Sequence, residues 1–293
     1  MAIDISRQTT NVIFDPEISS EIITKAIDES AIMQLAQTME VAGNGKKFQT
    51  ITGDPVPEWV GETDAKPVGK FSFGTKEVEP YKLAIIVPFS EEFREDKTAL
   101  YNECVNRLPK LFGPKIDATV MGTTAPGANF DVLGTAQAVS MTPPSGKTLY
   151  DQFIAADELI GNASGIMSGI ALSPQGRSKV LAALDGSDRP LFTAGVQTGT
   201  INPILGADVK VAKGIYVAGS PATYGLAGDF SNISYGVVKQ ITGSISDQAT
   251  LTYTDGDETV TLNLWQRNMF AVRFEMRIAV MVRDADTFVR LTA

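Results

Sequence analysis

The stretch from Phe270 to Arg283 alternates strictly between two sets of side chains. The first set is large and apolar, and comprises Phe270, Val272, Phe274, Met276, Ile278, Val280 and Val282. The second set is small or charged apart from one methionine, and comprises Ala271, Arg273, Glu275, Arg277, Ala279, Met281 and Arg283. Because successive side chains on a strand point to opposite faces, this period of two predicts a long, half-buried β-strand.

A second extended region runs from Asn44 to about Ser90 and is punctuated by prolines. It predicts a long β-ribbon whose outer part, from Asp54 to Gly69, has few large apolar residues apart from Trp59. Isolated two-stranded ribbons are marginal in water, so this part needs a supporting surface. A neighbouring subunit, a solvent-exposed flap and a ribbon folded back on its own domain all remain open at this point.

Helical spacing occurs at two places in the first half of the chain. Asp15 and Pro16 predict the start of a short amphipathic helix on an acidic N-terminal arm that ends near Gly43. A longer helix is expected after the acidic cluster Glu91, Glu92, Glu95 and Asp96, which suits the positive end of a helix dipole. Its apolar positions are Leu100, Cys104, Leu108, Leu111, Ile116 and Val120, and Pro109 with Gly113-Pro114 predicts a kink or a division.

From about Gly134 to Gln240 the pattern alternates helices with short strands and predicts a compact α/β lobe. One helix is expected from Leu149 to Gly161. Another is capped by Ser173-Pro174 and runs through Leu184 to a turn at Asp185-Gly186. Further on, Asp255-Gly256 between two alternating segments predicts a β-hairpin.

Composition excludes several classes of function. The 293 residues suffice for a hydrophobic core and predict two lobes. The absence of histidine argues against most hydrolytic triads and zinc sites. A net charge of −9 argues against broad coating of nucleic acid, and the single Cys104 is expected to pack. With no signal-peptide pattern and no long apolar run, neither secretion nor a membrane span is expected.

Three motifs invite a chemical interpretation and are better explained structurally. Gly146-Lys147-Thr148 lacks the first glycine of a phosphate loop, since Met141 occupies that position, and it is interpreted as a loop leading into a helix. There is no Gly-x-Ser-x-Gly elbow. The acidic run Asp255, Asp257 and Glu258 fits a hairpin turn better than a calcium loop. We therefore predict no catalytic, cofactor-binding or metal-binding residues, and no enzyme.

Several segments, in a consistent order, resemble the HK97-type phage major capsid proteins. They are PEWVGETDAKP with YKLAIIVPFSEEF, KIDATVMGT, LSPQGRSKVLAALDGSDRPLF, NPILGADVKVA, YGLAGDFSNISYGVV and the last 29 residues from Trp265. The resemblance implies an α+β HK97-like capsid fold. Its parts are an N-arm (1–43), an extended β-ribbon called the E-loop (44–90), a peripheral domain with a long spine helix and long strands (91–133 and 241–293), and an axial α/β domain (134–240).

The resemblance also implies a structural role, in which copies of the chain form the hexamers and pentamers of an icosahedral phage head around double-stranded DNA. In this family the E-loop lies over an adjacent subunit, which makes Trp59 a candidate anchor. The implied contact residues are Trp59, Val60, Glu62, Asp64, Lys66 and Lys70 on the E-loop, and Arg273, Arg277 and Arg283 on the peripheral strand.

The resemblance also implies partner proteins, and two alternative functions remain open. The expected partners are a separate scaffolding protein, a portal and a possible decoration protein, with assembly in the host bacterial cytoplasm and no membrane. The lysine cross-link of some relatives is not expected at Lys66 or Lys70. An encapsulin-like compartment that packages a cargo enzyme is the alternative with the same fold. An unrelated α/β enzyme with a flap is a third reading.

Overall fold

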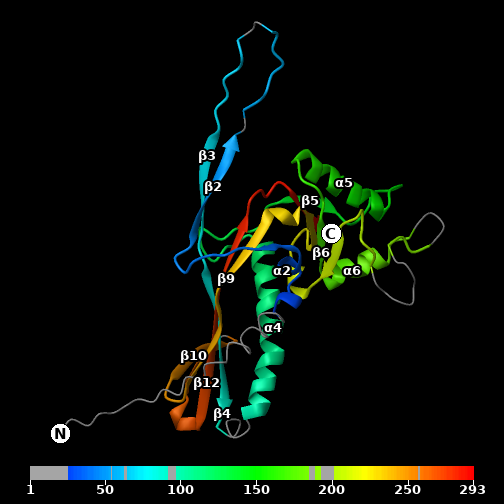
Figure 1. The fold of residues 1–293 in the computed structure, drawn as a ribbon. Coiled ribbons are helices and arrows are strands. Elements are labelled where there is room, and N and C mark those ends of the chain that lie inside the picture. The colour runs from blue at the N-terminus through cyan, green and yellow to red at the C-terminus, as the bar shows by residue number, and fades with distance from the viewer. Residues whose placement is uncertain are drawn as a thin grey trace.

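The computed structural model describes residues 26–53, 55–62, 65–91, 97–184, 189–192, 201–256 and 258–293. It has an elongated body, a lobe at its side and a ribbon that projects far beyond both (Figure 1). The body and lobe combine helices with sheets, so the expected α+β class is confirmed. Residues 26–28 are helical, whereas most of the helix expected on the N-terminal arm lies outside the described residues.

The body is built on a four-stranded sheet with the order β1-β9-β12-β4. Its long central strand β12 (Met269–Val282) pairs antiparallel with both β4 (Tyr81–Ser90) and β9 (Ile233–Ser246), and β1 (Gln37–Thr38) adds a short parallel edge. The seven apolar residues predicted for one face of β12 are all buried, which confirms the period-two prediction. They pack in one cluster with residues of helix α4 (Lys97–Met121).

Helix α4 is one continuous element through Pro109 and Gly113-Pro114, so of the two predicted outcomes the division is wrong, and the kink stays a prediction. A proline inside a helix removes one backbone hydrogen bond and crowds the preceding turn. Burial of Phe112 and Ile116 in the body core, on both sides of Gly113-Pro114, favours the continuous helix nevertheless. The side chains of Leu100, Cys104 and Leu108 lie outside the described part of the chain, as do the acidic residues from Glu92 to Asp96.

A buried carboxylate joins α4 to the arm. Ser30 caps helix α2 (Ala31–Leu35), and its hydroxyl donates to Asp117 Oδ1 at 2.5 Å. The backbone N–H groups of Ala31 and Ile32 donate to the same carboxylate at 3.0 and 3.3 Å. Burial raises the pKa of Asp117 to about 6, although the hydrogen bonds from Ser30, Ala31 and Ile32 oppose the rise.

The lobe at the side is a second core. Its five-stranded sheet has the order β5-β13-β8-β6-β7, and helices α5 (Leu149–Asn162) and α6 (Pro174–Leu181) pack against it. The strands are β5 (Gln137–Ser140), β6 (Gly169–Leu172), β7 (Asp208–Val211), β8 (Thr223–Gly228) and β13 (Phe288–Thr292), with short 3-10 turns at Lys213–Ile215 and Phe230–Asn232.

Both predicted helices of the lobe are present, with small differences at their ends. Thr148 begins α5 in a capping box with Asp151, which confirms that Gly146-Lys147-Thr148 leads into a helix. Ser173 caps α6 as expected, but α6 ends at Leu181 and does not reach Leu184. The turn expected at Asp185-Gly186 lies outside the described residues.

Strands from three predicted segments lie in sheets that the predicted boundaries did not anticipate. β4 was expected in the E-loop and β9 begins in the predicted axial segment, yet both pair with β12 in the body. β13 was expected in the peripheral segment, yet it pairs with β5 and β8 in the lobe. Strand pairing joins residues far apart in the chain, so contiguous segments do not reveal it.

Candidate functional site

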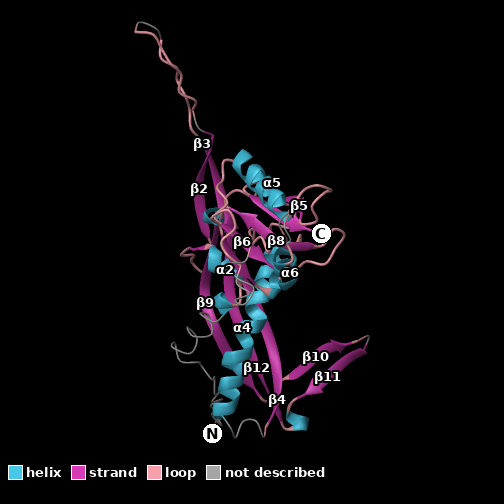
Figure 2. Ribbon diagram, turned by 90° about the vertical axis from the view of Figure 1, so that its right-hand side faces the viewer, coloured by secondary structure: helices cyan, strands magenta, loops and turns pink. Residues whose placement is uncertain are grey.

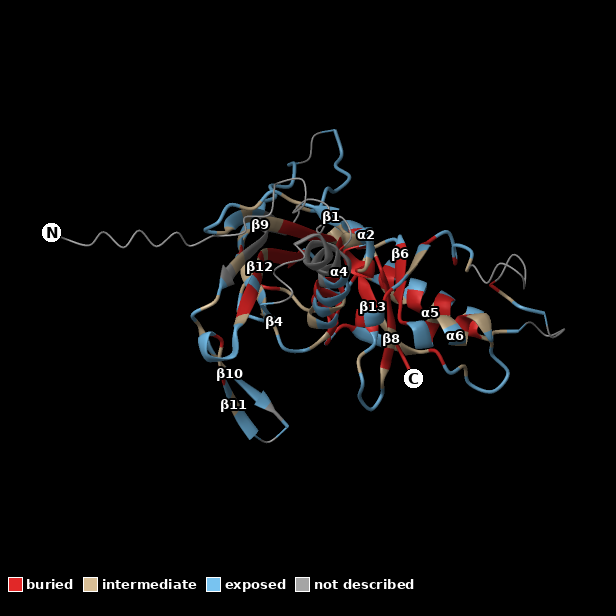
Figure 3. Cartoon of the chain, turned by 90° about the horizontal axis from the view of Figure 1, so that it is seen from below, coloured by how far each residue is buried: buried red, intermediate tan, exposed pale blue. Residues whose placement is uncertain are grey.

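The ribbon consists of strands β2 (Lys46–Gly53) and β3 (Ser72–Val78), paired antiparallel, and an outer part from Pro55 to Phe71. In the outer part, the exposed fraction is 105% for Trp59 and 92% for Val68. Figure 3 shows the ribbon exposed, whereas buried residues gather along the body sheet and in the lobe. The outer part therefore packs on no described part of its own chain, which excludes the folded-back alternative for these residues.

Of the six predicted E-loop contact residues, five lie on this outer part and are exposed: Trp59, Val60, Glu62, Lys66 and Lys70. Asp64 lies outside the described residues. The structure thus brings the predicted ribbon residues together on one projecting segment. Within a single chain this segment lies well away from β12, which carries Arg273 and Arg277 and is followed directly by Arg283 (Figure 1).

The outer face of β12, opposite α4, is covered at both ends and open in the middle. Ala279 and Met281 are buried beneath the base of the ribbon, in a cluster with Val78. Ala271 is buried at the other end beneath the hairpin of β10 (Thr250–Asp255) and β11 (Glu258–Asn263). The hairpin predicted at Asp255-Gly256 is confirmed, with Gly256 at φ +60°, and it projects from the body in Figure 2.

We call the open middle of this face the saddle, formed by Lys82, Ile86, Arg273, Glu275 and Arg277. Lys82 stands opposite Arg277 across the β4–β12 pair, and Ile86 stands opposite Arg273. Ile86 is 48% exposed, so the saddle offers apolar surface as well as charge. With three cations and one carboxylate, it carries a net positive charge of two.

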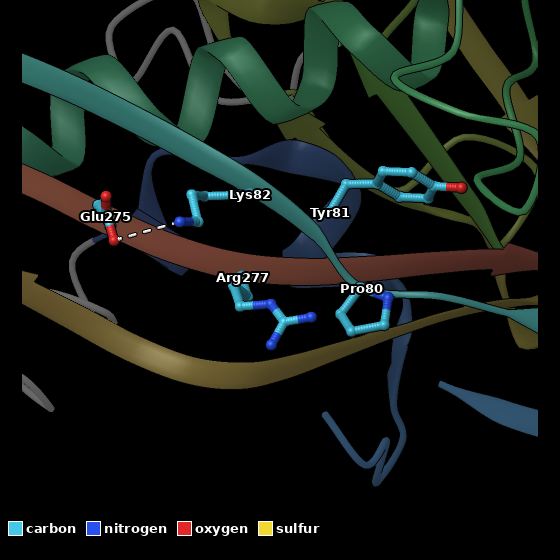
Figure 4. Close-up of a pocket in the computed structure, with 5 residues that line it drawn as sticks. All are labelled: Pro80, Tyr81, Lys82, Glu275 and Arg277. Atoms are coloured by element: carbon cyan, nitrogen blue, oxygen red, sulfur yellow. Dashed lines mark ion pairs between the residues drawn. The ribbon is translucent and has the colours of Figure 1, made fainter. Parts of the chain in front are cut away.

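The saddle charges already interact with one another. Arg273 Nε lies 3.1 Å from Glu275 Oε1, and Lys82 Nζ lies 3.6 Å from Glu275 Oε2. Arg277 donates to the Gly43 carbonyl at 2.9 Å. Figure 4 shows Lys82 reaching toward Glu275, with Arg277 beside Pro80. These four residues and Tyr81 line a hollow of about 420 Å³. Two of the three predicted arginines therefore have partners within the chain, and Arg283 is exposed beyond the saddle.

Sequence reasoning missed Lys82 and Ile86 as members of this surface. The alternation of YKLAIIVPFS was visible, but only the pairing with β12 places Lys82 and Ile86 beside the arginines. It also missed a second exposed aromatic group at the hairpin end of the body, where Trp265 is 69% and Tyr253 is 47% exposed. The sequence did show Trp265 close to the predicted hairpin, but the exposure that marks it as a surface feature comes from the structure.

Within the described ranges, no group of three acidic, histidine or cysteine side chains is arranged to hold a metal ion. No helix among the same residues is long and apolar enough to cross a membrane.

Relatives of known kind cover almost the whole chain. The probable major capsid protein gp17 of Mycobacterium phage L5 is 29% identical over 290 residues, which is 95% of this chain and 88% of that protein. The major capsid protein of Staphylococcus phage 80alpha is 23% identical over 278 residues, which is 94% of this chain and 83% of that protein.

Solved structures share the fold. A chain of Microbacterium phage Oxtober96 superimposes with a TM-score of 0.71 at 19% identity, covering 90% of this chain and 91% of that one. The expected HK97-like capsid fold is confirmed by such neighbours. Residues 10–293 match the phage capsid family, and the chain therefore belongs to that family.

Proposed function

We propose that this chain is the major capsid protein of a tailed bacteriophage, and that the ribbon of one copy lies across the saddle of an adjacent copy. The observation that carries the proposal is the full exposure of Trp59 on the outer part of the ribbon, which packs on no described part of its own chain. Family membership and the names of the relatives support the same role.

Charge and apolar area make the saddle a suitable surface for the ribbon. The outer part of the ribbon carries Glu58, Glu62 and Asp64 against Lys66 and Lys70, a net charge of −1, and the saddle is positive. Burying Trp59 removes ~200 Å² from water, which contributes about 5 kcal/mol at ~25 cal/mol per Å². Exposed ion pairs add only ~0–1 kcal/mol each, so the tryptophan provides the affinity and the charges provide the register.

A contact between two different surfaces of the same chain is head-to-tail, and it closes into a ring when the rotation between copies allows. Hexamers and pentamers of an icosahedral head are such rings. The acidic chain contains double-stranded DNA within the shell without gripping it. A separate scaffolding protein, a portal and a decoration protein are proposed partners, assembly takes place in the bacterial cytoplasm, and the subunit has no enzymatic activity.

The test is assembly of the purified full chain, alone and together with any scaffolding protein that the same genome encodes. Megadalton particles in size-exclusion chromatography and closed shells in electron micrographs are expected. A chain that stays monomeric under every assembly condition, scaffold included, contradicts the proposal. The relatives named as phage capsid proteins favour a phage head over an encapsulin-like compartment, and a cargo enzyme copurifying with the shell would reverse that preference.

A further inference from the structure

The ribbon is fastened to the body by a charged contact at its base. Lys76 Nζ of β3 lies 2.7 Å from Asp131 Oδ2 and donates to the carbonyl of Val282 at 2.5 Å. The backbone N–H of Val282 donates to the same Asp131 oxygen at 2.7 Å. We call these three residues the clasp. They connect the ribbon, the last residue of β12 and the loop that follows α4.

The clasp lies where the ribbon leaves the body. Along β3 the residues facing the body are Val78, which is buried with Ala279 and Met281, and then Lys76 two positions further out. Lys76 reaches Val282, where β12 ends. Phe73, still further out, is already 72% exposed. An apolar cluster that includes Phe48, opposite Lys76, therefore holds the base of the ribbon, and the clasp adds a polar attachment two residues beyond Val78 on β3.

Asp131 is fixed by its own loop. The loop is anchored on the end of α4, because the N–H of Leu133 donates to the Val120 carbonyl at 2.6 Å. The same loop contacts the start of β4, where the N–H of Asn129 donates to the Tyr81 hydroxyl at 3.2 Å. A Cβ on Gly127 would lie only 2.2 Å from the Tyr81 ring, so the loop and β4 are in close contact. The carboxylate is thus held on the rigid body.

Small rotations at this point have large effects at the far end of the ribbon. The extended chain beyond Lys76 reaches about 40 Å at ~3.3 Å per residue. A rotation of about 10° at the base displaces a tip at that distance by roughly 7 Å, which exceeds the width of a strand spacing of ~4.8 Å. Complementary interfaces do not tolerate such a displacement.

We propose that Lys76 and Asp131 are positioning residues that set the direction in which the ribbon leaves the body, and thereby align it with a second copy of the chain. This inference rests on the proposed function. One attachment point permits rocking about itself, whereas two points separated along β3 do not. The side chains of Lys76 and Asp131 are 32% and 27% exposed, so solvent screens this pair less than a fully exposed one.

The test compares Lys76→Met with Lys47→Met in the full-length chain. Lys47 is the matched control because it forms an ion pair with Glu77 on the same ribbon, with side chains 71% and 44% exposed. In Lys76→Met, amide exchange of residues 72–78 should become about tenfold faster while exchange in β12 stays unchanged. Because the contact is repeated over many copies, the yield of closed shells should fall about tenfold or more. Lys47→Met should change neither.

Lys76→Arg keeps a cationic donor and should restore both the slow exchange and the shell yield. Unchanged exchange and normal shells in Lys76→Met would overturn the clasp. Equal losses in Lys76→Met and Lys47→Met would do the same, because they would indicate a general effect of charge on the ribbon. If the unaltered chain forms no shells at all, the proposed function fails, and the exchange comparison still decides whether the clasp holds the ribbon.

Discussion

Strand β12 and the outer ribbon are both long extended segments, but they obtain their stability from different sources. Along β12 one face is buried against α4, and the other is buried at both ends. Along the outer ribbon, Trp59 and Val68 are almost fully exposed. The body and lobe hold themselves together, whereas the outer ribbon buries little within its own chain. Under the proposed function, the ribbon is completed by another copy of the chain, so folding and assembly depend on different parts of the molecule.

The strongest challenge to this comparison is Trp59→Ala. The substitution should leave the free energy of unfolding of the subunit within about 0.5 kcal/mol, because the side chain buries nothing in the free chain. It should nevertheless reduce the yield of closed shells by 100-fold or more, since the loss of roughly 5 kcal/mol is repeated at every contact. Denaturant unfolding and electron microscopy measure the two effects. A normal shell yield would show that Trp59 on the ribbon does not contribute to the contact between copies.

Phe274→Ala tests the opposite half of the comparison. Phe274 is 1% exposed in the body core, and truncating it should reduce the free energy of unfolding by about 3–5 kcal/mol. The matched control is Phe73→Ala on the ribbon, where the side chain is 72% exposed and the change should stay within about 0.5 kcal/mol. Equal losses in the two variants, measured by urea unfolding, would contradict the separation of folding from assembly.

Because Asp117 is buried in the body, the free energy of unfolding should depend on pH through this carboxylate. Its pKa is raised from 3.8 to about 6 in the folded chain, so the folded state holds this proton more tightly than the unfolded state. The stabilisation is therefore complete below about pH 4 and is lost as the pH rises through 6. Between pH 7 and pH 5 the unaltered chain should gain roughly 1 kcal/mol relative to Asp117→Asn.

The Asp117→Asn comparison is needed because other carboxylates titrate in both proteins, and only the difference isolates this site. Urea unfolding at several pH values provides the measurement. The measured quantity is the free energy of unfolding of the unaltered chain minus that of Asp117→Asn. If it does not change with pH, or shrinks on acidification, burial does not raise the pKa of Asp117.

The smallest effect is expected at the saddle charges. Arg273→Gln removes an ion pair with Glu275 whose arginine side chain is 52% exposed. The contact with a neighbouring ribbon should weaken by about 0–1 kcal/mol, and the effect should fade at high salt. Assembly midpoints at low and high ionic strength test this. A loss as large as that of Trp59→Ala would mean that charge, and not the tryptophan, dominates the contact.

Local sequence patterns predicted most elements and few of their partners. The alternation around Phe274 and the cap at Ser173 depend on neighbouring residues, and both predictions are confirmed. The pairing of β4 with β12 was not predicted, because a strand joins whichever sheet buries its apolar face. The prolines of α4 predicted a kink or a division, and the helix is not divided, since the core contacts of Phe112 and Ile116 outweigh a local defect.

The candidate site also has features that local sequence predicts and features that it does not. Composition and spacing were enough to predict that the outer ribbon has too little apolar surface to stand alone and that Trp59 is its main apolar side chain. The surface that Lys82 and Ile86 form with Arg273, and the contact of Lys76 with Asp131 across the base of the ribbon, depend on the packed fold. Such contacts join residues distant in the chain, and they form only when separate elements pack together.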